Sequence, residues 1–266
     1  MNYHLETGDT LELLRAMKSE SVDFICTSPP YPGVSSMWGD FFSPENFEES
    51  HAWLDMVWGE CARVLKSGCK MAINVANIGR NPYLANHARL YQWAWHCPLV
   101  EPKADIIWHK QETVRANTAW GSYRNPTDMH FCDGHEYISV FRKVGKREAK
   151  TTKQVIDKDD FLKWRMSIWK IEPESATRVK HIAPFPVEIP RRLITLYTFE
   201  GETVLDPFSG MASTGVACVK LNRDYIGFEH NPEYVAASIE RLNESQFSIG
   251  QSNKTINQNM ELVTMF

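Results

Sequence analysis

The residues best suited to chemistry stand in two short segments that lie far apart in the chain. The first is Thr27-Ser28-Pro29-Pro30-Tyr31, directly after Val22–Cys26. The second is Asp206-Pro207-Phe208-Ser209-Gly210, directly after Thr203–Leu205. Both preceding runs are typical of buried strands. Because ligands of an open α/β sheet bind at the carboxyl ends of strands, both segments are candidates for a site.

In the first segment, two consecutive prolines fix the backbone and remove two N–H donors. The Ser28 hydroxyl and the Pro29 carbonyl remain as hydrogen-bond acceptors with fixed directions, and the ring of Tyr31 offers a face for stacking. This set suits an aromatic amine whose nitrogen lone pair must point at an electrophile. A proline-rich turn at the end of a strand is the plain alternative, and the second segment favours the site.

The second segment has the pattern of a glycine loop that opens a helix. Gly210 permits close approach of the backbone, and Phe208 is placed to lie against a ligand ring. Glu229 ends the next predicted strand, where a carboxylate commonly accepts hydrogen bonds from ribose hydroxyls. A nucleotide-type ligand is therefore expected. A Rossmann dehydrogenase stays open as an alternative, although the full Gly-x-Gly-x-x-Gly pattern is absent.

The elements that must position these segments alternate between strand-like and helix-like patterns. Strands are predicted at Val22–Cys26, Met71–Val75, Ala104–Trp108, Tyr137–Phe141, Thr203–Leu205 and Tyr225–Phe228. Helices are predicted after Asp9 in a capping-box pattern, and at Trp53–Leu65, Leu84–Trp95, Glu188–Tyr197, Ala212–Lys220 and from Pro232 to near Leu242. This alternation predicts an α/β fold with a largely parallel sheet.

We expect one domain over residues 1–244, with the polar stretch 143–170 as an inserted recognition module. Residues 245–266, rich in Ser, Asn and Gln, are expected to form a flexible tail. The sequence contains neither a secretory signal nor a membrane-length apolar run, and its six cysteines are scattered, so reduced thiols in a cytoplasm are expected. The Cys132–His135 pair alone does not make a metal site, and no metal is expected.

Charge is unevenly distributed along the chain. The net charge is −4, and the first 60 residues hold eleven acidic residues but only two basic ones. From Arg142 to Lys180, twelve Lys or Arg stand against six acidic residues. Such a positive segment suits a surface that faces nucleic acid, and a solvated loop or helix face would explain it equally well.

Taken together, these segments resemble the amino-methylating DNA methyltransferases of the beta class. In that family a Ser/Asp/Asn-Pro-Pro-Tyr motif precedes a Phe-x-Gly-x-Gly motif, which is the order found here. Further matches place the resemblance over about residues 4–242; they are Gly8-Asp9, Thr118–Ser122, His135–Ile138 and His181–Glu188. One departure is Ala212, where the family usually has glycine.

The resemblance implies a Rossmann-like, S-adenosylmethionine-dependent methyltransferase fold. It implies a mostly parallel seven-stranded sheet with helices on both faces and a circularly permuted motif order. It assigns the target amino group to Ser28, Pro29, Pro30 and Tyr31. It assigns the S-adenosylmethionine pocket to Asp206, Phe208, Ser209, Gly210 and Glu229, with His181 near the methionine end and Asp9 near the adenine end. For Asp9, a helix N-cap is an equal alternative.

By the same resemblance, the expected reaction is methylation of an exocyclic amine on a base flipped out of double-stranded DNA. A serine as the first motif residue favours N4 of cytosine, whereas aspartate favours N6 of adenine. C5 methylation requires a cysteine nucleophile, and the usual Pro-Cys pair is absent. RNA or small-molecule methylation and a non-catalytic DNA-binding role remain alternatives.

Further expectations concern partners. The candidate DNA contacts are Arg115, Arg124, Arg142, Lys143, Lys146 and Arg147. The resemblance suggests double-stranded DNA, a cognate restriction endonuclease and a second copy of the chain as partners, with no membrane. It suggests a cytoplasmic protein of prokaryotic or phage-encoded type.

Overall fold

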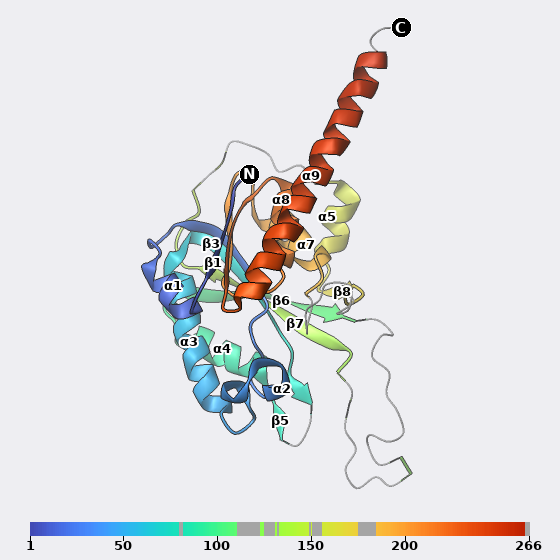
Figure 1. Ribbon diagram of the computed structural model, residues 1–266. Coiled ribbons are helices and arrows are strands. Elements are labelled where there is room, and N and C mark those ends of the chain that lie inside the picture. Colours follow the sequence, from blue (N-terminus) through green and yellow to red (C-terminus); the bar gives the residue numbers. More distant parts are fainter. Residues whose placement is uncertain are drawn as a thin grey trace.

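The computed structural model describes residues 1–79, 82–110, 123–124, 131, 133–148, 150, 156–174 and 185–263, with side chains through residue 248. The described chain forms an α/β structure in which helices cover both faces of a central sheet (Figure 1). No helix in these ranges is both long enough and apolar enough to cross a membrane.

The central sheet has eight described strands in the order β1-β10-β9-β2-β3-β7-β6-β8. Their bounds are β1 Tyr3–Thr7, β2 Val22–Thr27, β3 Leu65–Val75, β6 Val100–His109, β7 His135–Lys143, β8 Ile168–Lys170, β9 Thr203–Asp206 and β10 Asp224–Glu229. Strand β7 is antiparallel to both of its neighbours, and the other pairs are parallel. The predicted mostly parallel α/β sheet is confirmed, and the short edge strand β8 adds an eighth strand to the expected seven. A separate hairpin pairs β4 Ile78–Gly79 with β5 Tyr83–Leu84.

The helices fall into two layers. Their bounds are α1 Thr10–Ala16, α2 Ser35–Trp38, α3 Phe47–Val64, α4 Asn86–His96, α5 Lys158–Trp164, α7 Glu188–Tyr197, α8 Ser213–Leu221 and α9 Pro232–Val263, with a 3-10 turn, η1, at Asp40–Phe42. Successive side chains of a strand point to opposite faces. Ile25 of β2 therefore packs in the cluster built with α1, α3 and α4. Its neighbours Phe24 and Cys26 pack in the cluster built with α7 and α8. A strand buried on both faces explains why Phe24, Ile25 and Cys26 are consecutive apolar residues rather than alternating with polar ones.

The insert predicted at residues 143–170 is packed into the domain where it is described. Helix α5 ends at Trp164 and β8 carries Trp169, and both indoles are buried. The Trp169 ring nitrogen donates to the Trp164 carbonyl at 3.1 Å, and β8 pairs with β6 in parallel. This part of the insert therefore extends the sheet and its core.

Helix α9 differs from the expectation that the last helix ends near Leu242. It continues to Val263 and extends away from the rest of the molecule (Figure 1). Residues 245–263, which were expected to belong to a flexible tail, are therefore helical. Leu242 is fully buried, whereas Phe247 is 69% exposed. A helix satisfies its own backbone hydrogen bonds, and no proline interrupts this one after Pro232, so it continues beyond the packed region.

Candidate active site

The two segments singled out in the sequence meet at the carboxyl edge of the sheet. Strands β2 and β9 are direct neighbours, with Phe24 opposite Val204 and Ile25 opposite Leu205. At their ends, the Thr27 hydroxyl donates to the Asp206 carboxylate at 2.7 Å. The residues that follow each strand therefore open onto the same space.

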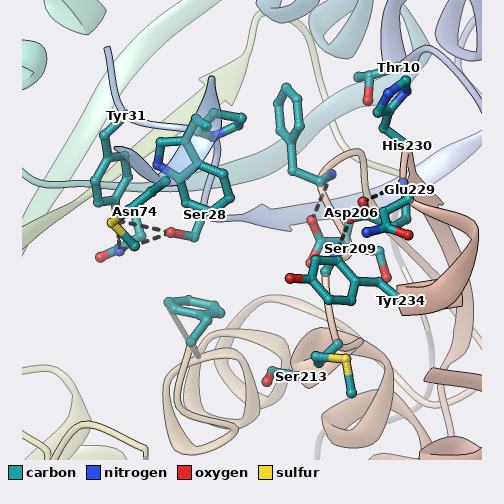
Figure 2. Close-up of a pocket in the computed structure, with 18 of the residues that line it drawn as sticks. Thr10, Ser28, Tyr31, Asn74, Asp206, Ser209, Ser213, Glu229, His230 and Tyr234 are labelled. Carbon is teal, nitrogen blue, oxygen red and sulfur yellow. Dashed lines mark hydrogen bonds between the residues drawn. The ribbon is translucent and has the colours of Figure 1, made fainter. Parts of the chain in front are cut away.

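That space is a cavity of about 650 Å³, which is large enough for a nucleotide-sized ligand. Figure 2 shows Ser28, Tyr31 and Asn74 at one side of it, and Asp206, Glu229 and Tyr234 at the other. Other lining residues include Asp9, Thr10, Pro30, Trp38, Trp108, Lys110, Glu136, Phe185, Phe208, Ser209, Gly210 and His230. Pro29 is buried and is not among the residues that line the cavity.

A hydrogen-bond network holds the Ser28 side of the cavity. The Tyr31 hydroxyl donates to Glu136 Oε2 at 2.8 Å and lies 2.9 Å from the Ser28 hydroxyl. Asn74 Nδ2 lies 2.7 Å from the Tyr31 oxygen, 2.5 Å from Glu136 Oε2 and 3.3 Å from Ser28 Oγ. Burial, reinforced by the negative charge of Glu136, raises the pKa of Tyr31 well above its ordinary value, so this phenol keeps its proton.

Three strands converge on this network. Asn74 lies on β3, Glu136 is the second residue of β7, and Lys110 directly follows β6. Lys110 forms an ion pair with Glu136 Oε1, and its ammonium lies 5.2 Å from the centroid of the Trp108 ring. Glu136 is only 6% exposed, so its charge is compensated inside the wall of the cavity.

The other side of the cavity is built around Glu229 at the end of β10. Its Oε2 accepts from the Gly210 amide at 2.9 Å, and its Oε1 accepts from the Asn231 amide at 2.8 Å. Because each carboxylate oxygen has a second lone pair, Glu229 can still accept from two ligand hydroxyls. The Tyr234 ring lies nearby in the wall of the same cavity (Figure 2).

Asp206 lines the cavity and also connects β2 to β9. Its Oδ1 accepts both from Thr27 Oγ1 and, at 3.1 Å, from the Phe208 amide. Burial raises the pKa of Asp206 to about 6. Ser209 is similarly structural, because its hydroxyl lies 2.8 Å from the buried Tyr225 hydroxyl.

The backbone of the loop after β9 shows why the family usually has glycine at the position of Ala212. Gly210 and Ala212 both have positive φ, of 49° and 53°. Glycine adopts this left-handed conformation without a side-chain clash, whereas alanine does so at a cost. The position therefore favours glycine, and Ala212 occupies it with a fully buried methyl group. Phe208 packs at ring-centroid distances of 6.0 Å from both Trp53 and Trp58 of α3.

Two residues expected at the S-adenosylmethionine pocket have different outcomes. The Asp9 side chain accepts from the Glu12 amide at 3.0 Å, so it caps α1, and it also lines the cavity. The two alternatives considered for Asp9 are thus compatible. His181 lies outside the described residues.

The basic stretch expected to contact DNA is placed at the opposite edge of the sheet. Strand β7 runs away from Glu136 at the cavity, and Arg142 follows six residues later, roughly 20 Å along a strand that rises about 3.3 Å per residue. Arg142 pairs with Glu101 at 2.7 Å. Lys143 is buried and donates to the carbonyls of Arg63 and Leu65.

The rest of that stretch follows the same pattern. The Arg147 guanidinium donates to the Tyr197 carbonyl at 2.8 Å and pairs with the buried Glu202 at 2.5 Å. Lys146 is exposed. The expectation that these four basic residues bind the DNA that reaches the cavity does not fit their position at the far edge of the domain, where Arg142, Lys143 and Arg147 already have partners within the protein. Positive charge in the sequence did not reveal which side chains were already paired.

Of the other two candidate DNA contacts, Arg115 lies outside the described residues. Arg124 is exposed, and its guanidinium lies 5.2 Å from the Tyr123 ring centroid. It belongs to the connection between β6 and β7, whose two ends carry Lys110 and Glu136 at the cavity.

Sequence reasoning gave no role to Asn74, Lys110 or Glu136. Glu136 lies in the segment His135–Ile138, which resembled the family, and Asn74 is a polar residue in the apolar strand Met71–Val75. A buried polar residue in a core strand is a usable signal, because such groups need a partner. No group of three or more His, Cys, Asp or Glu residues in the described chain is arranged to hold a metal ion.

Comparison with known proteins agrees with this geometry. The family model N6_N4_Mtase, described as DNA methylase, matches residues 22–240. Type II methyltransferase M.MjaI of Methanocaldococcus jannaschii is 28% identical over 301 residues, which cover 98% of this chain and 96% of that protein. DNA adenine methyltransferase YhdJ of Escherichia coli is 26% identical over 253 residues, covering 88% and 81%.

A solved structure is similar over nearly the whole chain. The putative DNA modification methylase TTHA0409 from Thermus thermophilus, crystallised with S-adenosyl-L-methionine, superposes with a TM-score of 0.75 at 28% identity. The match covers 92% of this chain and 96% of that one.

Proposed function

We propose that the target of this protein is the N4 amino group of cytosine, because the chain belongs to the DNA methylase family, whose model spans residues 22–240. Family membership makes the protein an S-adenosylmethionine-dependent DNA methyltransferase of the N4/N6 group. The observation that carries the proposal is that Ser28 and Glu229 open onto one cavity, with a hydroxyl that could accept from an amine on one side and a carboxylate that could accept from a ribose on the other.

The residues at the Glu229 end fit S-adenosylmethionine. Glu229 would accept from the ribose hydroxyls, and the glycine loop at Gly210 would allow close approach of the ligand. Phe208 and Tyr234 supply aromatic surface in the same wall. When bound, S-adenosylmethionine supplies an electrophilic methyl group on a sulfonium centre.

The residues at the Ser28 end would position the amine. The Ser28 hydroxyl, which lines the cavity, would accept an N–H bond of the amine, so that the nitrogen lone pair faces the methyl donor. Tyr31 would stack on the base and offset part of the few kcal/mol that flipping a base costs. Holding two reactants in such a geometry can lower a barrier by about 7–11 kcal/mol relative to free encounter, so positioning would supply most of the rate.

Ser28 supports cytosine as the target base, because serine at the first motif position resembles the N4-cytosine members of the family. N6 of adenine is the second candidate, and the similarity to the adenine methyltransferase YhdJ favours it. Both targets are exocyclic amines, so the same acceptors would serve either one.

The proposed partner is double-stranded DNA, approached through Arg124 and Arg115 on the β6–β7 connection. The relatives named as type II methyltransferases support a cognate restriction endonuclease as a further partner. A homodimer and a cytoplasmic location are proposed on the family resemblance alone.

The direct test is to incubate the purified protein with unmethylated DNA and S-adenosylmethionine, hydrolyse the DNA, and identify the modified nucleosides by mass spectrometry. N4-methylcytosine is the expected product. N6-methyladenine would overturn the choice of base while keeping the class of reaction. Methylated RNA, with unmodified DNA, would overturn the proposal.

A further inference from the structure

The network beside Ser28 contains a chain of hydrogen bonds that ends on a carboxylate. Tyr31 has a single hydroxyl proton, and it is directed at Glu136 Oε2 at 2.8 Å. The Ser28 and Tyr31 oxygens are 2.9 Å apart, so one of them must donate to the other. Since the Tyr31 proton is already used, Ser28 is the donor.

This direction decides what Ser28 can do for a ligand. With its own proton on Tyr31, the Ser28 oxygen presents lone pairs and can only accept from a group in the cavity. An amine nitrogen that is to attack an electrophile must donate its protons away from the attacking lone pair. An accepting Ser28 is therefore productive, and a Ser28 that donates toward the amine is not.

We propose that Glu136 is a positioning residue that fixes the direction of this chain and so keeps Ser28 an acceptor for the target amine. The inference rests on the proposed amine methylation, and it holds for cytosine or adenine. An ionised carboxylate has no proton to donate, so the reverse direction would leave two oxygens facing each other without a hydrogen at 2.8 Å.

Lys110 and Asn74 reinforce this arrangement. Lys110 forms an ion pair with Glu136 Oε1, which directs Oε2 at Tyr31. Asn74 turns its amide N–H groups toward Glu136 and Tyr31, although in the described chain its buried Oδ1 has no hydrogen-bond partner. Leaving a buried acceptor without a partner costs free energy. We therefore attribute the orientation of Asn74 to the Glu136 carboxylate, which needs hydrogen-bond donors.

Glu136→Gln tests the proposal with almost no change of shape. Lys110 requires an acceptor at the Oε1 position, so the new amide NH₂ must occupy the Oε2 position and donate toward Tyr31. Asn74 can turn its Oδ1 to meet that NH₂, and Tyr31 then donates to Ser28. The chain is reversed without a cavity. Lys110, whose side chain is 22% exposed, keeps a hydrogen-bond acceptor at the Oε1 position but loses its counter-charge.

The expected result is a fall in kcat of about 10- to 100-fold, the loss that follows from one misdirected hydrogen bond. The KM for DNA and the affinity for S-adenosylmethionine measured by calorimetry should change little, and a cooperative melting curve checks that the variant is folded. Glu136→Asp, which keeps a carboxylate, should recover part of the lost kcat.

A double-mutant cycle separates the effect of Glu136 on the direction of the hydrogen-bond chain from a nonspecific loss of activity. Tyr31→Phe keeps the stacking ring but cuts the chain, so Glu136→Gln should cause little further loss in that background. Tyr31→Phe by itself also tests the idea if Glu136→Gln does not fold, and wild-type kcat in Tyr31→Phe would overturn it. Additive losses from the two substitutions, or full activity of Glu136→Gln, would overturn it as well.

Asp105→Asn is the matched control. Asp105 lies on β6 and accepts from the Tyr91 hydroxyl at 2.8 Å and from Ser139 at 2.7 Å, yet it does not line the cavity. Its substitution alters another tyrosine–carboxylate bond, between α4 and β6, and should leave kcat unchanged. If wild-type protein produces no methylated amine, the proposed function fails. If the wild-type protein methylates an amine and the Glu136 variants have the same kcat as wild type, the proposed function stands and this inference fails.

Discussion

Thr27 and Asp206, which are 179 residues apart in the sequence, are joined by a 2.7 Å hydrogen bond between the ends of β2 and β9. Asp206 also accepts from the Phe208 amide, so one buried carboxylate fixes the starts of both loops that form the cavity. This link makes the geometry of the Ser28 end depend on the geometry of the Glu229 end.

The burial of Asp206 should appear in the pH dependence of stability. Its pKa is raised to about 6 in the folded protein from an ordinary value of 3.8. A raised pKa stabilises the fold fully below pH 3.8, and this contribution is lost as the pH rises through about 6. The difference of about 2 pH units corresponds to about 3 kcal/mol.

Asp206→Asn should remove this contribution. The melting temperature of wild type relative to the variant should therefore fall between about pH 4 and pH 6 and level off above, measured by calorimetry. Parallel curves for the two proteins over that range would show that Asp206 titrates normally.

Glu229→Ala should weaken the binding of S-adenosylmethionine. Loss of hydrogen bonds to a charged acceptor costs about 1.5–3 kcal/mol, which raises Kd by roughly 10- to 150-fold. Isothermal titration calorimetry measures this directly. Glu200→Ala, at an exposed site, is the control and should bind normally. Equal affinities of the two variants would exclude Glu229 from the binding site.

Ala212 offers a test of backbone strain in the loop after β9. Its φ of 53° costs alanine about 1–2 kcal/mol, whereas Ala212→Gly removes a buried methyl worth about 0.8 kcal/mol. The two effects nearly cancel, so the free energy of unfolding in urea should change by no more than about 1 kcal/mol. Ala212→Val should destabilise by about 2 kcal/mol or more, because the branched side chain is strained at this φ and overpacks the core. A stable Val variant would mean that the loop adopts another conformation.

The two groups of basic residues should differ in their response to salt. Arg124→Ala should weaken DNA binding and lower the slope of log affinity against log salt concentration by about 1, the loss of one phosphate contact. Lys146→Ala, at the far edge of the sheet, should leave both affinity and slope unchanged. Fluorescence anisotropy at several salt concentrations measures both quantities. The opposite pattern would return the DNA surface to the basic stretch.

Sequence alone determined the elements near the site closely. The predicted helix Glu188–Tyr197 has the observed bounds of α7, and the predicted strands at Val22 and Thr203 became β2 and β9. These elements are short or strongly patterned, and their ends are marked by Pro, Gly or Asp. Local chemistry was therefore sufficient to place Ser28 and the loop that contains Gly210 directly after strands.

Tertiary structure decided what local pattern does not encode. Which carboxylate faces Tyr31 depends on β7 running antiparallel beside β3, which brings Glu136 next to Asn74 across 62 residues of sequence. Whether a basic side chain is free to bind DNA depends on its partners in the folded protein. Arg147 is paired with Glu202, which is buried and far from it in sequence. A motif specifies the residues of one loop, but the electrostatics of a site come from side chains that only the packed sheet brings together.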